Sequence, residues 1–303
     1  METPLVSIII TTHNRFELLC RAIDSVLSQT YKNTEIIVVD DYSSDGTEKK
    51  IIKYLGSVTF VRNSKNLGIS ASRNIGIRTA SGGYISFLDD DDELLPFKIE
   101  KQIDFLNSNP GIDIVYCGST KKFRSSRIQK LPKLKGNIFP EVLDSCPNAI
   151  HTILVNRKCF DRVGFFDEKV RYYEDFDFWI RLSRGCLFGF VPECLVIYNI
   201  HGCQMSTYYG EAISGIDYIL DKHKEIFKVN KKYLYLHLRR QASKCAANDD
   251  YKLFYKYLFK SIQARPFYMS SYIHLLLSLV SRQLHKKLIT AFGVKDIDGI
   301  VTF

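Results

Sequence analysis

A dense run of acidic residues follows an apolar segment in the first third of this 303-residue chain. Phe87 and Leu88 lead directly into four aspartates and a glutamate, Asp89 to Glu93. Neighbouring carboxylates repel each other, so a folded domain that crowds them needs a counter-charge. Divalent cations such as Mg²⁺ and Mn²⁺ prefer oxygen ligands and often hold substrate phosphates with one or two carboxylates. The run therefore predicts a metal site, and the alternative is a solvated turn that caps a helix beginning near Pro96.

Apolar, β-branched runs alternate with helical patterns through the first part of the chain. Strands are expected over 5–10, 35–40, 58–62, 83–88 and 112–117, and helices over 15–28, 47–55, 70–79 and 96–107. This alternation predicts a parallel sheet with right-handed crossovers, whose strands bind ligands at their carboxyl ends. Asn14 is expected to cap the first helix, and Asp92 the helix after the acidic run. Residues 120–145 are basic and predicted to be rich in loops.

The positive charge of the chain is concentrated in its last third. The net charge is +9, and residues 221–290 hold fifteen Lys and Arg against four acidic residues. A basic helical region interleaved with aromatic residues suits an anionic lipid surface, and the alternative is a helical cap with a solvated face. No segment reaches the roughly 20 apolar residues of a membrane span. The eight cysteines lack zinc-type spacing, which is typical of reduced thiols in a cytosolic protein.

Several motifs, in order, resemble glycosyltransferase family 2. They are the segments 6–15 (VSIIITTHNR), 25–31 (SVLSQTY), 35–47 (EIIVVDDYSSDGT), 66–68 (NLG), 71–76 (ASRNIG) and the acidic run. The resemblance spans about residues 4–205 and implies a GT-A fold, a Rossmann-like and mostly parallel α/β sheet flanked by helices. It predicts a GT-A catalytic domain over 1–210, with a nucleotide-binding half over 1–118 and an acceptor half over 119–210. A basic helical region is expected over 211–303.

The resemblance also implies a nucleotide-sugar site at the strand ends. The residues expected to bind the donor are Thr11, His13, Asn14, Asp40, Asp41, Arg73, Asp89 and Asp90. Asp41 is the expected uracil contact, and Arg73 can pair with phosphate or with the nucleoside carbonyl. The alternatives are turn capping for the two aspartates at 40 and 41 and a surface role for Arg73. Asp91 is the predicted principal ligand of Mn²⁺ or Mg²⁺, with Asp89 and His201 as further ligands.

A second acidic cluster, residues 174–177, resembles the general-base motif of inverting family members. Asp175 is the predicted base, with Glu174 as second choice, and Asp177 is expected to point elsewhere on a helix. The alternative is an ordinary helix N-terminus rich in acidic residues. Trp179 is predicted to belong to the core. His201 lies in a segment that resembles the closing loop of the family, and the alternative is a structural histidine.

These motifs predict an inverting, metal-dependent hexosyltransferase. It would transfer a sugar, glucose first, from a UDP-sugar to a lipid-diphosphate-linked acceptor such as GlcNAc-diphospho-undecaprenol. The product would carry a β linkage, in O-antigen (lipopolysaccharide) or capsule biosynthesis. The enzyme would be cytoplasmic and peripherally associated with the inner membrane through the basic C-terminal region, with no nucleic-acid partner.

Other functions remain open at the level of sequence. A glycosyltransferase that uses UDP-galactose or a UDP-N-acetylhexosamine on another acceptor is the nearest alternative. A basic membrane- or nucleic-acid-binding module without catalysis is more remote, and salt-sensitive binding to DNA or RNA would distinguish it. A nucleotidyltransferase is disfavoured because no glycine-rich triphosphate loop follows the first strand. A dehydrogenase is disfavoured because no G-x-G-x-x-G follows any expected strand.

Overall fold

The protein is described from a computed structural model over residues 3–200, 209–292, 294–295 and 301–302. It divides into two compact units. The sheet unit comprises Met1–Phe139 and Pro147–Gln204, and the helical unit comprises Pro140–Cys146 and Met205–Phe303. The sequence predicted a single boundary at residue 210. The helical unit also contains the short segment 140–146 from the middle of the chain.

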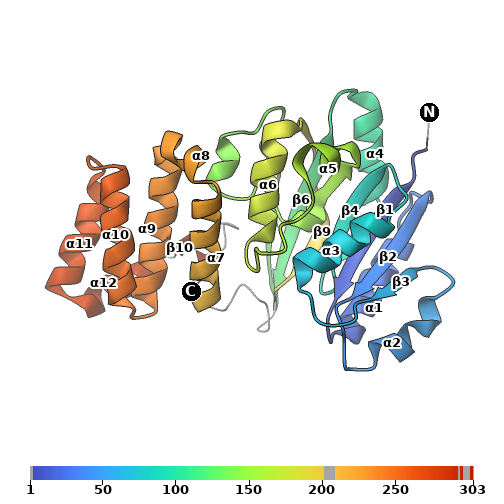
Figure 1. Ribbon diagram of the computed structural model, residues 1–303, viewed down its shortest axis with the longest axis horizontal. Helices are drawn as coiled ribbons and strands as arrows, with labels where there is room; N and C mark the ends of the chain where they lie inside the picture. The colour runs from blue at the N-terminus through green and yellow to red at the C-terminus, as the bar shows by residue number, and fades with distance from the viewer. Residues whose placement is uncertain (1–2, 201–208, 293, 296–300, 303) are drawn as a thin grey trace. The chain divides into compact units, whose positions relative to one another are not determined.

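The described strands of the sheet unit form one mixed sheet (Figure 1). They are β1 (Val6–Thr12), β2 (Thr34–Asp40), β3 (Thr59–Arg62), β4 (Tyr84–Asp89), β5 (Glu93–Leu94), β6 (Ile114–Phe123), β7 (Ser126–Lys130), β8 (Ile153–Asn156) and β9 (Phe188–Asn199). Their order is β3-β2-β1-β4-β8-β6-β9-β5, with β7 paired to β6. The first four strands in this order are parallel, as the alternating pattern predicted. The strand β8 then pairs antiparallel to both β4 and β6.

Helices cover both faces of this sheet (Figure 1). They are α1 (Phe16–Leu27), α2 (Thr47–Lys50), α3 (Ile69–Thr79), α4 (Lys98–Ser108), α5 (Lys158–Val163) and α6 (Glu174–Gly185), with short 3-10 helices η1 (Ile51–Tyr54) and η3 (Ile150–Thr152). The helices α1 and α4 share a core with Ile8 and Ile10 of β1. On the opposite face α3 lies so close to β1 that a Cβ at Gly76 would come within 2.4 Å of Ile9. This α/β architecture confirms the predicted fold class.

Two local predictions were wrong. Asn14 does not cap α1. Its side chain bonds to the Ser44 amide (2.6 Å), and Asp45 instead accepts the Phe16 amide hydrogen of α1 (3.2 Å). The stretch 120–145 contains a hairpin of β6 and β7. The side chains of β7 are mostly exposed, so its sequence lacks the apolar alternation that identifies a half-buried strand.

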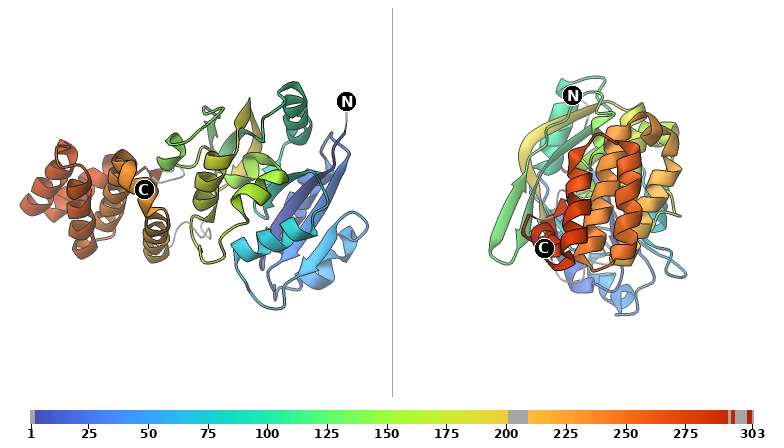
Figure 2. Two further views of the ribbon diagram at one scale, coloured as in Figure 1. Left: turned by 45° about the horizontal axis from the view of Figure 1, so that its top comes forward. Right: turned by 90° about the vertical axis from the view of Figure 1, so that its left-hand side faces the viewer.

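The helical unit is built from antiparallel helix pairs and a short hairpin. Its elements are η2 (Glu141–Leu143), α7 (Tyr209–Lys222), α8 (Lys224–Val229), α9 (Lys231–Ala247), α10 (Tyr251–Ala264), α11 (Met269–Val280), α12 (Arg282–Phe292), β10 (Val294–Lys295) and β11 (Val301–Thr302). Figure 2 shows its longer helices side by side. The segment at 140–146 contacts α9, where a ring nitrogen of His237 lies 2.7 Å from the Leu143 carbonyl. None of the described helices is both long and apolar enough to cross a membrane.

Candidate active site

The ends of three parallel strands bring the predicted donor-site residues to one edge of the sheet. In the strand register Thr11 of β1 lies beside Val39 of β2 and beside Asp89 of β4. Thr12 lies beside Asp40, the last residue of β2. Parallel strands present their carboxyl ends together, and this is where open α/β sheets bind ligands.

Asp41 organises the loops at this edge. Its carboxylate accepts hydrogen bonds from the Asn63 amide side chain (2.8 Å) and from the backbone amides of Leu67 (2.7 Å) and Gly68 (2.8 Å). The Asp41 carbonyl lies 2.8 Å from Nδ1 of His13. The residue predicted to contact uracil therefore also fixes the loop that leads into α3. A carboxylate has about four acceptor sites, so Asp41 could accept one further hydrogen bond, from uracil, besides those from these three donors.

Asp40 lies inside the turn that follows β2. Its side chain is fully buried, and one oxygen accepts hydrogen bonds from the amide and hydroxyl groups of Ser43. The other oxygen lies 3.3 Å from the Arg62 guanidinium. A donor contact by Asp40, as predicted, would require an exchange of these bonds. The Asn14 side chain also bonds to this turn, where it accepts the Ser44 amide hydrogen. The backbone of Asn14 is left-handed, with a φ of 55°.

The carboxylates of the acidic run turn to different partners. Asp90 accepts a hydrogen bond from the Thr12 hydroxyl (2.7 Å) and lies 3.2 Å from the Arg15 guanidinium. Asp91, the predicted principal metal ligand, lies 3.0 Å from the same guanidinium. Burial raises the pKa of Asp90 to about 7. Arg15 thus supplies part of the counter-charge that the acidic run requires, and the sequence analysis did not single it out.

Arg73 joins the acidic run to the second acidic cluster. Its guanidinium is almost fully buried and lies 2.7 Å from both Asp89 of β4 and Glu174 of α6. Burial, the largest single influence, raises the pKa of Asp89. The charge and hydrogen bond of Arg73, together with the nearby His151 and Arg15, bring this pKa below its ordinary value. The same two carboxylates raise the pKa of Arg73 against the effect of burial. Arg73 is therefore a buried cation with two anionic partners.

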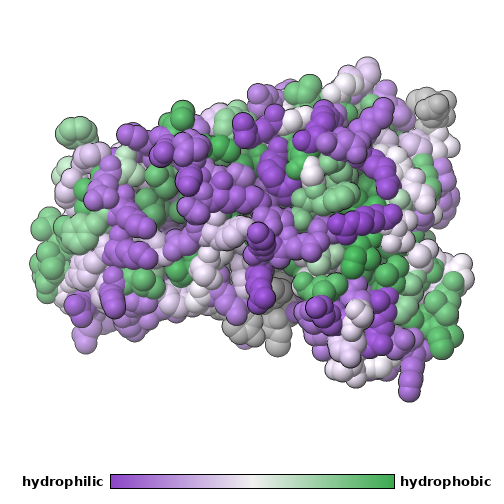
Figure 3. All heavy atoms as spheres, viewed as in Figure 1, coloured by the Kyte–Doolittle hydropathy of each residue, from purple (hydrophilic) through white to green (hydrophobic). Residues whose placement is uncertain are grey.

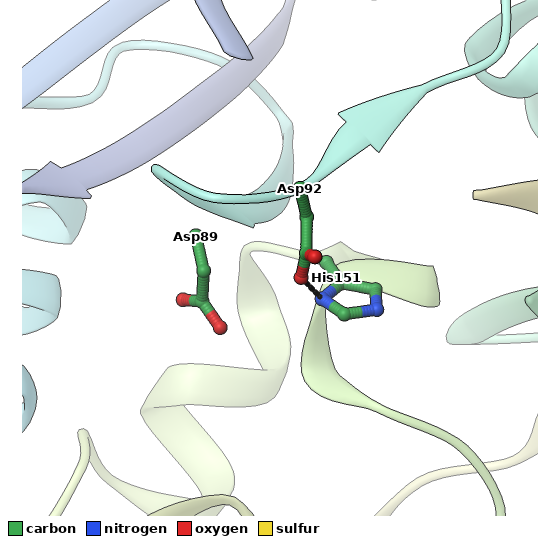
Figure 4. A group of neighbouring side chains, drawn as sticks. All are labelled: Asp89, Asp92 and His151. Carbon is green, nitrogen blue, oxygen red and sulfur yellow. Dashed lines mark ion pairs between the residues drawn. The ribbon is translucent and has the colours of Figure 1, made fainter. Parts of the chain in front are cut away.

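A second group of ligand atoms lies beside this bridge. One oxygen or nitrogen atom from each of Asp89, Asp92 and His151 falls within 4.8 Å of the others (Figure 4). Nδ1 of His151 lies 2.8 Å from Asp92. Both side chains are buried, and Nε2 of His151 has no hydrogen-bond partner among the described residues. Burial raises the pKa of Asp92 to about 6.

The predicted cap role of Asp92 was wrong. Besides its contact with His151, Asp92 accepts a hydrogen bond from the backbone amide of Asn199 (2.8 Å). The Asn199 side chain donates to the Asp91 carbonyl (2.8 Å). These contacts hold the end of β9 against the acidic run. His201, the third predicted metal ligand, lies two residues further on, outside the described residues.

The predicted general bases stand at the start of α6. Glu174 is held by Arg73, whereas an oxygen of Asp175 accepts the Phe176 backbone amide hydrogen (2.7 Å). Asp177 is fully buried and pairs with Arg181 of the same helix at 2.9 Å. Trp179 is fully buried, which confirms its predicted core role.

The ligand chemistry of the cluster fits a divalent cation. Two carboxylates and one imidazole supply oxygen and nitrogen ligands, a set that Mn²⁺ accepts, whereas Mg²⁺ prefers oxygen alone. An orphaned buried ring nitrogen is unusual in a folded protein. Asp89 was predicted as a ligand, but Asp92 and His151 were not. No local pattern in the sequence identifies His151, because antiparallel pairing of β8 with β4 brings it to the site.

Comparison with known proteins identifies the chain as an enzyme that transfers sugars. Residues 7–166 match the model of Glycosyl transferase family 2, and the chain belongs to this family. A glycosyltransferase of Rickettsia prowazekii is 36% identical over 218 residues, which cover 68% of this chain and 67% of the relative. One of Methanocaldococcus jannaschii is 32% identical over 215 residues, covering 66% and 72%. S. aureus TarS 1–349 in complex with UDP-GlcNAc has a TM-score of 0.70 at 16% identity, covering 94% of this chain and 90% of TarS 1–349.

Proposed function

We propose that this glycosyltransferase inverts the anomeric centre of a UDP-sugar and transfers the sugar to a lipid-diphosphate-linked acceptor. Glucose is the first donor to test, followed by galactose and the N-acetylhexosamines. The proposed setting is O-antigen or capsule biosynthesis at the cytosolic face of the inner membrane. The complex of TarS with UDP-GlcNAc supports a uridine-diphosphate donor on this fold, and it does not choose the sugar.

The contact of Arg73 with Asp89 and Glu174 carries the proposal. It fixes the carboxylate of the donor motif relative to the first turn of α6, where Asp175 follows Glu174. A buried guanidinium with two carboxylates has little freedom to move, so the distance between donor site and base is preorganised. The acceptor hydroxyl would lose its proton to Asp175 as its oxygen bonds to C1, and the bond from C1 to the diphosphate would break.

Asp89, Asp92 and His151 would hold Mn²⁺, with Mg²⁺ as the weaker alternative. When bound, this ion would neutralise charge on the leaving diphosphate. Arg15 would retain Asp90 and Asp91 at the rim, where the two aspartates can meet ribose hydroxyls or the water around the ion. That Asp91 is the principal metal ligand stays a prediction. To bind the ion, Asp91 would have to give up its ion pair with Arg15.

The test is release of UDP from a panel of UDP-sugars by the purified full chain. The assay uses Mn²⁺ or Mg²⁺, with and without a synthetic lipid-diphosphate-GlcNAc. We expect acceptor-stimulated release from one donor, lost on chelation and restored by Mn²⁺. Asp175→Asn should lower the rate by about 10²- to 10⁴-fold. The matched control is Asp161→Asn, on an exposed carboxylate of α5, which should retain the rate.

Three outcomes would contradict parts of this proposal. Retention of more than a third of the rate by Asp175→Asn would exclude it as the base. Full activity in a chelator would exclude the metal. Release that no lipid-linked acceptor stimulates, from a protein that binds UDP tightly, would exclude the proposed acceptor class while leaving the donor class intact.

A further inference from the structure

Helix α11 has an inverted distribution of polar and apolar residues. It contains no charged residue, and the side chains it buries in the helical unit are Ser271 and Ser278. The exposed side chains are apolar: Met269 (68%), Ile273 (52%), Leu276 (63%), Leu279 (67%) and Val280 (80%). A helix on the surface of a water-soluble protein has the opposite arrangement, with leucines inside and hydroxyls outside.

The buried serines are satisfied within the helical unit. The Ser271 hydroxyl lies 2.9 Å from the Ser261 hydroxyl of α10, and Ser261 also donates to the Leu258 carbonyl (2.7 Å). Ser278 donates to the Leu275 carbonyl of its own helix (2.8 Å). Small residues let α10 and α11 approach closely, and hydroxyl contacts hold them. Helices that face lipid pack against each other in this way.

Further exposed apolar side chains occur near α11 in the sequence. Phe267, two residues before α11 begins, is 97% exposed, and Phe259 of α10 is 52% exposed. Leu284 of α12 is 48% exposed. Figure 3 shows green, hydrophobic residues at the left edge of the view, where α11 lies in Figure 1. Met269, Ile273, Leu276 and Val280 recur at helical spacing on one face of α11, and an exposed apolar face of this kind marks an interaction site on a folded protein.

Only basic charges flank this face in the sequence. No Asp or Glu occurs between Asp250 and Asp296. Arg265 precedes α11, and its guanidinium lies 4.7 Å from the centre of the Tyr268 ring. Arg282 follows α11 and lies 5.0 Å from the centre of the Tyr251 ring. Apolar residues between cationic groups complement a bilayer that carries anionic head groups.

We propose that the exposed face of α11, with Phe267 and Leu284, inserts into the interfacial layer of an anionic membrane. A 12-residue helix is about 18 Å long, which is too short to span a hydrocarbon core of about 30 Å, so α11 lies in the plane of the surface. A second copy of the chain fits this face less well than a membrane. Its own α11 would also lie between Arg265 and Arg282, so the two sets of positive charges would repel each other.

This assignment rests on the proposed function, in which the enzyme associates with the inner membrane. It assigns the membrane contact to the apolar face of α11, whereas the sequence analysis assigned it to the basic C-terminal region as a whole. Tyr235, Phe254 and Tyr257, which belong to the aromatic residues interleaved in the basic region, are each only 1% exposed. They form the core of the helical unit instead. The assignment does not depend on which sugar the enzyme transfers.

The experiment is co-sedimentation of the full chain with vesicles of phosphatidylglycerol and phosphatidylethanolamine, and with neutral phosphatidylcholine vesicles. The test variant is Ile273→Ser/Leu276→Ser/Leu279→Ser. The matched control is Ile52→Ser/Leu55→Ser, two residues of the sheet unit that are 65% and 53% exposed. We expect the test variant to bind anionic vesicles at least tenfold more weakly, and the control to bind as the unmodified chain does. The unmodified chain should bind neutral vesicles more weakly than anionic ones.

Light scattering and UDP release without vesicles complete the test. The proposal is supported if the test variant loses vesicle binding but keeps its oligomeric state, its helical content and its vesicle-free turnover. It is overturned if the unmodified chain ignores anionic vesicles, or if the test variant binds them equally well. It is also overturned if the unmodified chain is a dimer that the three substitutions dissociate. Because turnover is measured separately, an inactive protein that still binds vesicles would contradict the proposed function and not this assignment.

Discussion

The two units of the chain bury polar groups of opposite kinds. In the sheet unit the buried polar groups include charged side chains with specific partners, such as Arg73 between Asp89 and Glu174. In the helical unit α11 buries neutral hydroxyls and exposes leucines. Buried charges are costly unless they are paired, so a fold retains them where a site needs fixed geometry. Exposed leucines are unfavourable in water, so a fold retains them where another phase or molecule covers them.

The largest expected effect is that of Arg73→Ala in the sheet unit. This change leaves the carboxylates of Asp89 and Glu174 without their buried cation, so we expect a loss of about 3–5 kcal/mol in the free energy of unfolding. Turnover should fall below detection. The measurement is urea unfolding followed by circular dichroism. The control is Arg78→Ala on the exposed face of the same helix. A loss below about 1 kcal/mol would mean that the pairing around Arg73 is not essential to the fold.

His151→Ala tests the candidate metal ligands. Removal of the imidazole deletes one ligand and leaves the Asp92 carboxylate without its ring partner. We expect about 10- to 100-fold weaker binding of Mn²⁺, the range seen when groups around a metal are removed. Isothermal titration with Mn²⁺ in the presence of UDP measures it. Glu93→Gln is the control, because Glu93 lies in the same acidic run but outside the cluster. Equal loss in both variants would argue against a specific role for His151.

Two substitutions in α11 should reverse the usual rule for apolar residues. Ser271→Leu adds a larger apolar side chain at a closely packed contact, so we expect it to destabilise the protein by about 1–3 kcal/mol. Leu276→Ser removes an exposed apolar side chain and should change stability by less than about 0.5 kcal/mol. Urea unfolding of both variants in the absence of lipid compares them directly. The opposite ranking would mean that the exposed leucines are covered within the protein in solution.

A pH-dependent effect on stability is expected from His274 of α11. Burial, followed by the charge of Arg239, lowers the pKa of His274 from 6.5 to about 4. A lowered histidine pKa means that the unfolded chain binds the proton first as the pH falls. Stability should therefore decrease between about pH 6.5 and pH 4, by about 1–2 kcal/mol from this group. Unfolding curves of the unmodified chain and of His274→Gln across this range measure it. Parallel pH profiles for the two proteins would show that His274 does not contribute.

The sequence predicted the first half of the sheet and the location of the candidate site well. Runs of β-branched residues at 5–10 and 35–40 have the composition of buried parallel strands, and the acidic run directly follows the strand that becomes β4. These features are local, so they can be recognised in one chain without knowledge of its contacts. The exposed β6–β7 hairpin was missed because its polar residues do not alternate with apolar ones.

The partners of the acidic residues could not be predicted in the same way. The four aspartates of the acidic run are consecutive, yet they have different partners. Asp89 pairs with Arg73, and Asp92 pairs with His151. Asp90 contacts Thr12 and Arg15, and Asp91 contacts Arg15. Successive residues project in different directions, and the groups that meet them come from α3, β1, the residue before α1 and η3. Nothing in the sequence near residue 151 indicates which strand will pair with β8.

The sequence by itself therefore determined the family, the α/β fold class and the strand ends that carry the acidic groups, because these depend on local pattern. The tertiary structure decided that Arg73 joins the two acidic clusters and that His151 lies with Asp89 and Asp92. It also decided which face of α11 is buried. Ser271, His274 and Ser278 recur at helical spacing along one side of α11, and that side would be expected to face water. Only the packing of Ser271 against Ser261 of α10 shows that it is instead the buried side.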